Sequence, residues 1–252
     1  MMILDEIIRR TEKRVAELPP TFSKPTHVAH VSLKDAIKGA RQKNAIIAEI
    51  KCASPSRGVI RRNVDMPMMA GVFVDRGCVA LSILTEPYFF GGVQDDIAKV
   101  KSAVNVPVLR KDFIIDKRQI GETRSLGADA VLLIAAVLGD QLPDFVDETY
   151  DAGLEPLVEV RTDEEVRYAL ATRAQLIGIN NRDLTTLSIN RSATRHLSEP
   201  IRAAGKTVIS ESGIRSSDDI REMRPYCDAF LIGSAIMSDR KPGRKLEELV
   251  CA

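Results

Sequence analysis

The chain has no tryptophan, and aromatic residues make up only 4% of its 252 residues. A surface that binds single-stranded nucleic acid by stacking needs more aromatic side chains than this. The charges nearly cancel, since 36 Lys and Arg face 35 Asp and Glu, so no overall field attracts nucleic acid or a membrane surface. The longest apolar run, residues 130–138, is far too short to cross a bilayer. We therefore predict no nucleic-acid partner and no membrane partner.

Cysteine and histidine are also scarce. The four cysteines are far apart and form no CxxC motif, which argues against a disulfide framework and a zinc site and favours a reducing compartment. His27 and His30 are close in sequence but have no further ligand nearby, so we predict no metal. Asp5 and Glu6 interrupt the apolar pattern at the amino terminus, which is not typical of a secretory signal. We expect a cytoplasmic protein.

Short β-branched apolar runs recur along most of the chain, and each is followed by an amphipathic segment of helical period. Nearly continuous apolar strands that alternate with helices predict a parallel sheet with helices on its outer face. Because no linker divides the series, we predict an α/β protein with a single (β/α)8 TIM barrel, and a doubly wound open sheet is the alternative. The predicted strands are 45–50, 79–84, 106–110, 130–134, 155–160, 176–180, 207–212 and 229–233.

Two helices are expected before the first strand. Ile3, Ile7 and Val15 have helical spacing, and the pattern ends at Pro19-Pro20. Ser32 can cap a second helix, since its side chain can accept from a free amide of the first turn. The barrel is therefore preceded by an N-terminal helical extension.

Charged residues end several of the predicted strands, where a barrel of this kind has its active site. Glu49 and Lys51 are two positions apart and so face the same side of their strand, although a structural ion pair is the alternative. Arg110 and Lys111 end the third strand and place one or two cations at the mouth. Glu159 stands between valines, where a carboxylate is costly unless it is paired or used. Two further strand ends carry Asn180 and Glu211.

The last two strands are followed by glycine–serine turns, Ser212-Gly213 and Gly233-Ser234. Glycine lets the backbone come close to a ligand, and free amides at such turns attract anions. The loops after strands seven and eight commonly hold phosphate in this fold. We predict a phosphate site and a small phosphorylated substrate, with simple turns and helix caps as the alternative.

The segment 46–56, closed by Ile60, resembles the signature of the indole-3-glycerol-phosphate synthase family. Further similar segments follow in the family's order: 82–92, 108–116, 157–160, 177–184, 209–214 and 230–237. The resemblance implies one domain, a barrel over residues 45–252 with residues 1–44 as a helical extension over its mouth. It also implies a carboxy-lyase of tryptophan biosynthesis that uses no cofactor. Its substrate would be 1-(2-carboxyphenylamino)-1-deoxy-D-ribulose 5-phosphate, and its products indole-3-glycerol phosphate, carbon dioxide and water.

Carried over position by position, the resemblance implies that Lys111 is the general acid and Glu159 the general base. The matching supporting residues are Lys51, Glu49, Asn180 and Glu211. Ser54 and Arg182 match substrate contacts. The residues that match the phosphate-binding site are Ser212, Gly213, Gly233 and Ser234.

Ring closure needs a proton donor near the ketone, and desolvation or a second lysine would lower the pKa of Lys111 towards the working range. Which of Lys51 and Lys111 donates at each step stays open. Two other functions also stay open: a sugar-phosphate isomerase such as phosphoribosylanthranilate isomerase, and a barrel that binds phosphate ligands without turnover. A monomer and a weak homodimer are both compatible with the sequence, as is docking of another enzyme of the pathway.

Overall fold

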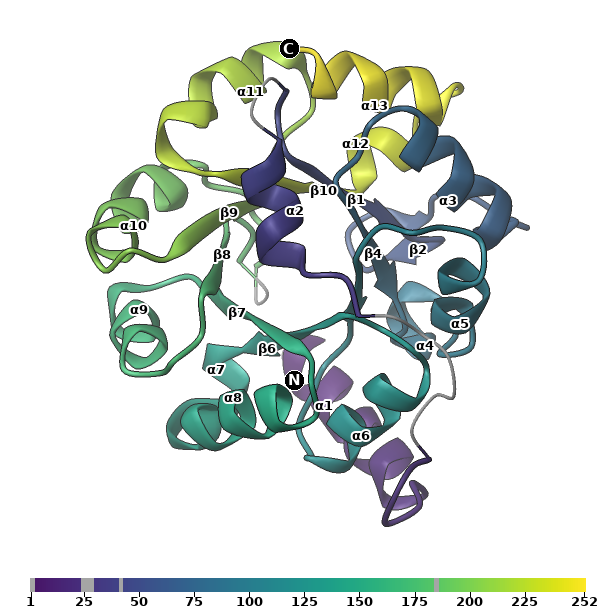
Figure 1. Ribbon diagram of the computed structural model, residues 1–252, viewed down its shortest axis with the longest axis vertical. Coiled ribbons are helices and arrows are strands. Elements are labelled where there is room, and N and C mark those ends of the chain that lie inside the picture. Colours follow the sequence, from purple (N-terminus) through teal and green to yellow (C-terminus); the bar gives the residue numbers. More distant parts are fainter. Residues whose placement is uncertain (1–2, 24–29, 41–42, 184–185) are drawn as a thin grey trace.

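The computed structural model describes residues 3–23, 30–40, 43–183 and 186–252. In this part of the chain, eight parallel strands close into a barrel surrounded by helices (Figure 1). The strands follow one another around the barrel in chain order, and β1 pairs with both β4 and β10. The closed ring confirms the predicted TIM barrel and excludes the open sheet. The barrel strands are β1 (Ile46–Ile50), β4 (Ala80–Leu84), β5 (Val108–Lys111), β6 (Ala130–Ile134), β7 (Glu155–Val160), β8 (Leu176–Asn180), β9 (Thr207–Glu211) and β10 (Ala229–Ile232).

The helices of six or more residues that lie between barrel strands fall in the predicted amphipathic segments. The helix bounds are α1 (Ile3–Ala16), α2 (Leu33–Gly39), α3 (Met66–Asp75), α4 (Pro87–Phe90), α5 (Asp96–Lys101), α6 (Arg118–Ser125), α7 (Ala135–Leu138), α8 (Leu142–Asp151), α9 (Asp163–Leu170), α10 (Ser192–Ala203), α11 (Ser217–Met223), α12 (Ser234–Met237) and α13 (Pro242–Val250). Ser32 caps α2 as predicted, since its hydroxyl accepts from the amide of Asp35. A short hairpin, β2 (Ala53–Ser54) and β3 (Gly58–Val59), lies in the loop after β1.

The alternation of side chains along each strand divides the core in two. On β1, Ala48 and Ile50 pack in the outer core between strands and helices, whereas Ile47 belongs to the inner core within the barrel. The next inward positions after Ile47 are Glu49 and Lys51, because a strand repeats every two residues. The barrel interior is therefore apolar towards the amino ends of the strands and ionic at their carboxyl ends.

The two N-terminal helices lie at opposite ends of the barrel. In Figure 1, α2 crosses the near end and α1 lies at the far end. The first amides of α2, those of Leu33 and Lys34, donate to the carboxylate of Glu155 at the start of β7. The prediction that residues 1–44 lie over the mouth therefore does not hold for α2, because Glu155 anchors its first turn at the amino end of the barrel.

Among the described residues, no helix is long and apolar enough to cross a membrane. In the same residues, no group of three or more His, Cys, Asp or Glu side chains is arranged to hold a metal ion. His27, one half of the histidine pair considered above, lies outside the described residues. His30 contacts the backbone oxygen of Asp129 at 3.1 Å.

Candidate active site

A cavity of about 510 Å³ opens at the carboxyl ends of the strands. All twelve residues that the family resemblance assigned to the site line this cavity. These residues are Glu49, Lys51, Ser54, Lys111, Glu159, Asn180, Arg182, Glu211, Ser212, Gly213, Gly233 and Ser234. Segments up to 185 positions apart in the chain, from Glu49 to Ser234, thus meet in one place.

Two lysines and three carboxylates pair with one another in the cavity. Lys111 Nζ lies 3.2 Å from Glu159 Oε2 and 3.1 Å from Glu211 Oε2. Lys51 Nζ lies 2.5 Å from Glu49 Oε1. The pairing of Glu49 with Lys51 does not remove them from the site, because both also line the cavity.

Lys111 is held as a cation by its neighbours. Burial lowers the pKa of Lys111, but Glu211, Glu159 and Glu49 together outweigh burial and raise that pKa above its usual value. The prediction of a lowered pKa is wrong, because it considered desolvation and Lys51 but not the number of carboxylates around the ammonium. Lys111 therefore carries its proton throughout the neutral range.

Glu211 is a carboxyl group whose ionisation is strongly affected by the fold. Burial raises its pKa to about 7, with Glu159 acting in the same direction and Lys111 opposing it. Glu211 Oε1 is buried and has no hydrogen-bond partner among the described residues. A carboxylate oxygen in this state is costly, which explains why the protonated form persists to neutral pH.

Glycines on the neighbouring strands let two carboxylates reach into the cavity. Gly178 of β8 lies beside Glu211, and a Cβ at Gly178 would overlap Glu211 Oε1. Gly233 has the same relation to Glu49, whose carboxylate occupies the space of the missing Cβ. Gly233, selected from sequence for phosphate binding, therefore also makes room for Glu49.

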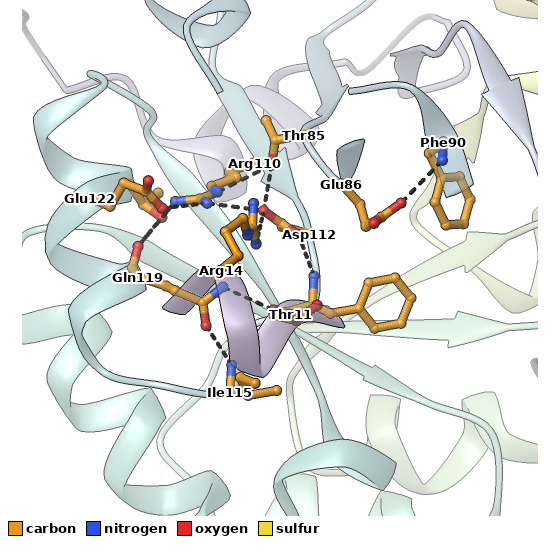
Figure 2. Close-up of polar contacts among 12 residues, drawn as sticks. Thr11, Arg14, Thr85, Glu86, Phe90, Arg110, Asp112, Ile115, Gln119 and Glu122 are labelled. Atoms are coloured by element: carbon orange, nitrogen blue, oxygen red, sulfur yellow. Dashed lines mark hydrogen bonds and ion pairs between the residues drawn. The ribbon is translucent and has the colours of Figure 1, made fainter. Parts of the chain in front are cut away.

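Arg110 does not enter the cavity, contrary to the prediction that it emerges at the mouth. It is fully buried, and its guanidinium donates to Thr123 of α6. The same guanidinium donates to Glu122 of α6 and to Asp112 (Figure 2). Neighbouring residues of a strand face opposite sides, so the inward direction of Lys111 requires Arg110 to point outwards. Strand β5 therefore contributes a single cation to the cavity.

Three arginines lie on the wall formed by the loops after β1, β8 and β9. Arg182 is preceded by Asn180, whose side-chain oxygen accepts from the Arg182 amide at 2.9 Å. Burial lowers the pKa of Arg182, and the nearby cations Arg57 and Arg215 lower it further. Arg57 and Arg215 also line the cavity but were missed from sequence. Their positions directly after the Ser54–Ser56 and Glu211–Ile214 segments are the signal that could have found them.

The glycine–serine turn after β9 is not a helix cap. The N-cap of α11 is Ser216, whose side chain accepts from the amide of Asp219. Ser212 and Gly213 both have positive φ, 66° and 91°, so the backbone bends sharply where it borders the cavity. Consecutive residues in such conformations expose amides to an anion.

The other half of the cavity is apolar, and sequence analysis did not identify it. Its lining comes from α1, from the loops after β4 and β5, and from β4 and β6. These side chains are Ile3, Leu4, Ile7, Leu84, Phe90, Phe113, Leu132 and Ile134. The ring centroids of Phe90 and Phe113 are 6.3 Å apart, so the two rings pack against each other within this apolar wall.

Several solved structures share the barrel. A ligand-free form of tryptophan synthase from M. tuberculosis aligns with a TM-score of 0.66 at 13% identity, over 89% of this chain and 100% of that chain. Phosphoribosyl anthranilate isomerase from Thermus thermophilus aligns with a TM-score of 0.57 at 13% identity, over 81% of this chain and 96% of that chain. At such low identity the likeness shows the fold alone.

Sequence comparisons are more specific. The family described as "Indole-3-glycerol phosphate synthase" matches residues 4–249. Relatives of that name come from Bordetella pertussis, with 46% identity over 84% of this chain and 82% of the relative, and from Carboxydothermus hydrogenoformans, with 43% identity over 89% and 87%. The chain therefore belongs to the indole-3-glycerol phosphate synthase family.

Proposed function

We propose that this chain converts 1-(2-carboxyphenylamino)-1-deoxy-D-ribulose 5-phosphate into indole-3-glycerol phosphate, carbon dioxide and water. It would thus act as a carboxy-lyase of tryptophan biosynthesis, which agrees with its family. The observation that carries the proposal is that one cavity joins Lys111 and its carboxylates to an apolar wall and to two glycine–serine turns. The substrate has a group for each part: a ketone, an aromatic ring and a phosphate.

Lys111 is the proposed general acid for ring closure. Attack of the ring carbon on the ketone places negative charge on the carbonyl oxygen, and a nearby ammonium stabilises that charge and can donate a proton. The carboxylates around Lys111 keep the donor protonated. Lys51 is the proposed cation for the substrate carboxylate, which leaves as carbon dioxide when the bond to the ring breaks.

Glu159 is the proposed base for the last step. The hydroxyl leaves as water and the adjacent carbon loses a proton, which together complete the indole ring and need both a donor and an acceptor. Glu159 is buried and lies beside Lys111, so an acceptor and a donor are in contact. Glu49, Asn180 and Glu211 support the two lysines and the substrate.

The phosphate is proposed to bind at the turns after β9 and β10. Ser212, Gly213, Gly233 and Ser234 supply the backbone there, with Ser54 and Arg182 as further substrate contacts. Arg57 and Arg215 add positive charge to the same wall. A phosphate dianion would relieve the repulsion among these three arginines.

The proposal also covers the domain organisation, cofactor use, cellular location and oligomeric state. The barrel over residues 45–252 and its extension over residues 1–44 form one domain, active without a cofactor in the cytoplasm. It would act as a monomer or a weak homodimer, open to docking of another enzyme of the pathway.

A turnover assay with the carboxyphenylamino ribulose phosphate tests the reaction. We expect indole fluorescence to appear together with carbon dioxide, in equal amounts. The alternative sugar-phosphate isomerase would give neither signal. Such an isomerase would use a cysteine and an aspartate as its acid–base pair, and Cys52 does not line the cavity. Binding of the substrate without formation of either product would favour the alternative of a barrel that binds phosphate ligands without turnover.

Replacing Lys111 by alanine should lower kcat by more than about a hundredfold, because the proton donor is lost, and change substrate affinity by less than about tenfold. Steady-state kinetics with a binding measurement checks this. Lys117→Ala removes an exposed lysine outside the cavity and is the matched control. A large loss of affinity at normal kcat would assign Lys111 to binding instead.

Glu159→Gln should depress turnover and leave phosphate binding intact, since the amide keeps the shape of the side chain but accepts no proton. Titration with inorganic phosphate and single-turnover kinetics separate the two effects. Glu164→Gln, on the exposed side of α9, should change neither. An unchanged rate in Glu159→Gln would remove this residue from the mechanism.

The raised pKa of Glu211 predicts opposite effects of pH on activity and stability. Ionised Glu211 accepts from Lys111, so kcat should rise as the pH passes about 7. The folded state favours the protonated carboxyl, so the contribution of this group to stability is fully present below pH 4.5 and is lost as the pH rises from there to about 7. Glu211→Gln should flatten the kcat profile near pH 7 and the Tm profile between about pH 4.5 and 7. A wild-type kcat that falls through pH 7 would contradict the assignment.

A further inference from the structure

Helix α1 forms one wall of the cavity although it belongs to none of the βα units of the barrel. Ile3, Leu4 and Ile7 line the cavity on its apolar side. A 14-residue helix with no strand to anchor it keeps its position through side-chain contacts. Two arginines of α1 make such contacts, one with the segment after β4 and one with the segment after β5.

Arg14 reaches a buried carboxylate beside Lys111. Its Nη2 atom donates to Asp112 Oδ2 at 2.9 Å (Figure 2). The same oxygen accepts from Arg110 at 2.9 Å and from Thr85 at 2.8 Å, while Oδ1 accepts from the amide of Phe113. Burial alone would raise the pKa of Asp112, but Arg110, Arg14 and Thr85 reverse that effect and lower it.

The position of Asp112 makes this contact relevant to the cavity. Asp112 lies between Lys111 and Phe113 in the chain, and all three line the cavity. The Asp112 side chain is fully buried and that of Arg14 is 14% exposed, so water screens this pair less than an ion pair on the surface. Arg14 is thus tied to the backbone that carries the proposed acid and one of the aromatic rings.

Arg10 makes the second contact, one turn earlier on the same face of α1. Its guanidinium carbon lies 5.2 Å from the ring centroid of Tyr88 and 5.5 Å from that of Phe89, within the range of cation–π attraction. Both rings belong to α4, where the buried carboxylate of Glu86 accepts from the amides of Tyr88, Phe89 and Phe90. Phe90, the next residue, turns its ring into the cavity.

We propose that Arg10 and Arg14 are positioning residues that hold α1 against the mouth as the wall for the aromatic part of the substrate. This pair is called the α1 clamp below, and the inference rests on the proposed function. The clamp joins α1 to the two segments that carry Phe90 and Phe113. It therefore holds together the three pieces that make up most of the apolar half of the cavity.

The clamp should affect binding more than chemistry. When Arg14 is removed, Asp112 still has Arg110 and Thr85 as partners, so no buried charge is left alone and Lys111 keeps its place. The wall supplied by Ile3, Leu4 and Ile7 would instead become mobile. Substrate affinity would then decrease, because the aromatic ring of the substrate would have to order α1 when it binds.

The test uses the double variant Arg10→Met/Arg14→Met, with Arg9→Met as the matched control. Arg9 is on the same helix, is as exposed as Arg10 and shares the carboxylate of Glu6 with it, but among the described residues only Arg10 of the two lies over aromatic rings. Hydrogen exchange of the α1 amides and steady-state kinetics are measured on each protein. In the double variant we expect exchange about tenfold faster or more, KM raised about tenfold or more, and kcat within about threefold of wild type.

The conservative variant Arg14→Lys tests the clamp further. Arg14→Lys retains a cation near Asp112, so its KM should lie between that of wild type and the raised KM of Arg14→Met, whereas a purely structural role predicts no such recovery. Unchanged exchange of α1 in the double variant would overturn the clamp. Faster exchange with unchanged KM would overturn its link to the substrate. A wild-type chain without turnover would overturn the proposed function, and the exchange rates would still test the clamp.

Discussion

The site depends on one partly buried ammonium and the carboxylates that face it. Lys111 lies between Glu159 and Glu211 within the barrel, where an unpaired charge of either sign would be unstable. Because the carboxylates outnumber the nearby cation, two consequences follow together. The Lys111 ammonium keeps its proton, and the Glu211 carboxyl stays protonated up to neutral pH. A donor that stays charged and an acid that titrates near 7 thus result from the same local imbalance.

This arrangement also explains the small residues at its edges. Gly178 and Gly233 leave the space that the carboxylates of Glu211 and Glu49 occupy. The ionic residues of the cavity lie next to the apolar inner core, on its side towards the carboxyl ends of the strands. They can therefore pair only with one another or with groups at the mouth. The apolar wall and α1 close it on one side, and the arginine-bearing loops border the other.

Much of the fold and the composition of the site could be predicted from the chain alone. Parallel barrel strands are buried on both faces, so their apolar runs stand out between helical segments, and the polar residues that end these runs meet at one mouth. The misses have equally definite causes. Arg110 was placed at the mouth because a strand end does not show which residue points inwards. The position of α2 was missed because it depends on the Glu155 carboxylate, more than a hundred residues away.

By itself, the sequence determined the barrel, the family resemblance and the residues that gather at the mouth, since these follow from local periodicity and from the order of motifs. Only the tertiary structure decided the ionisation of those residues and the wall that encloses them. The direction of a pKa shift depends on the number of charges within a few ångströms, and Lys111, Glu159 and Glu211 come from three different strands. The contact of α1 with Asp112 likewise joins positions 98 residues apart, a distance over which no local pattern carries information.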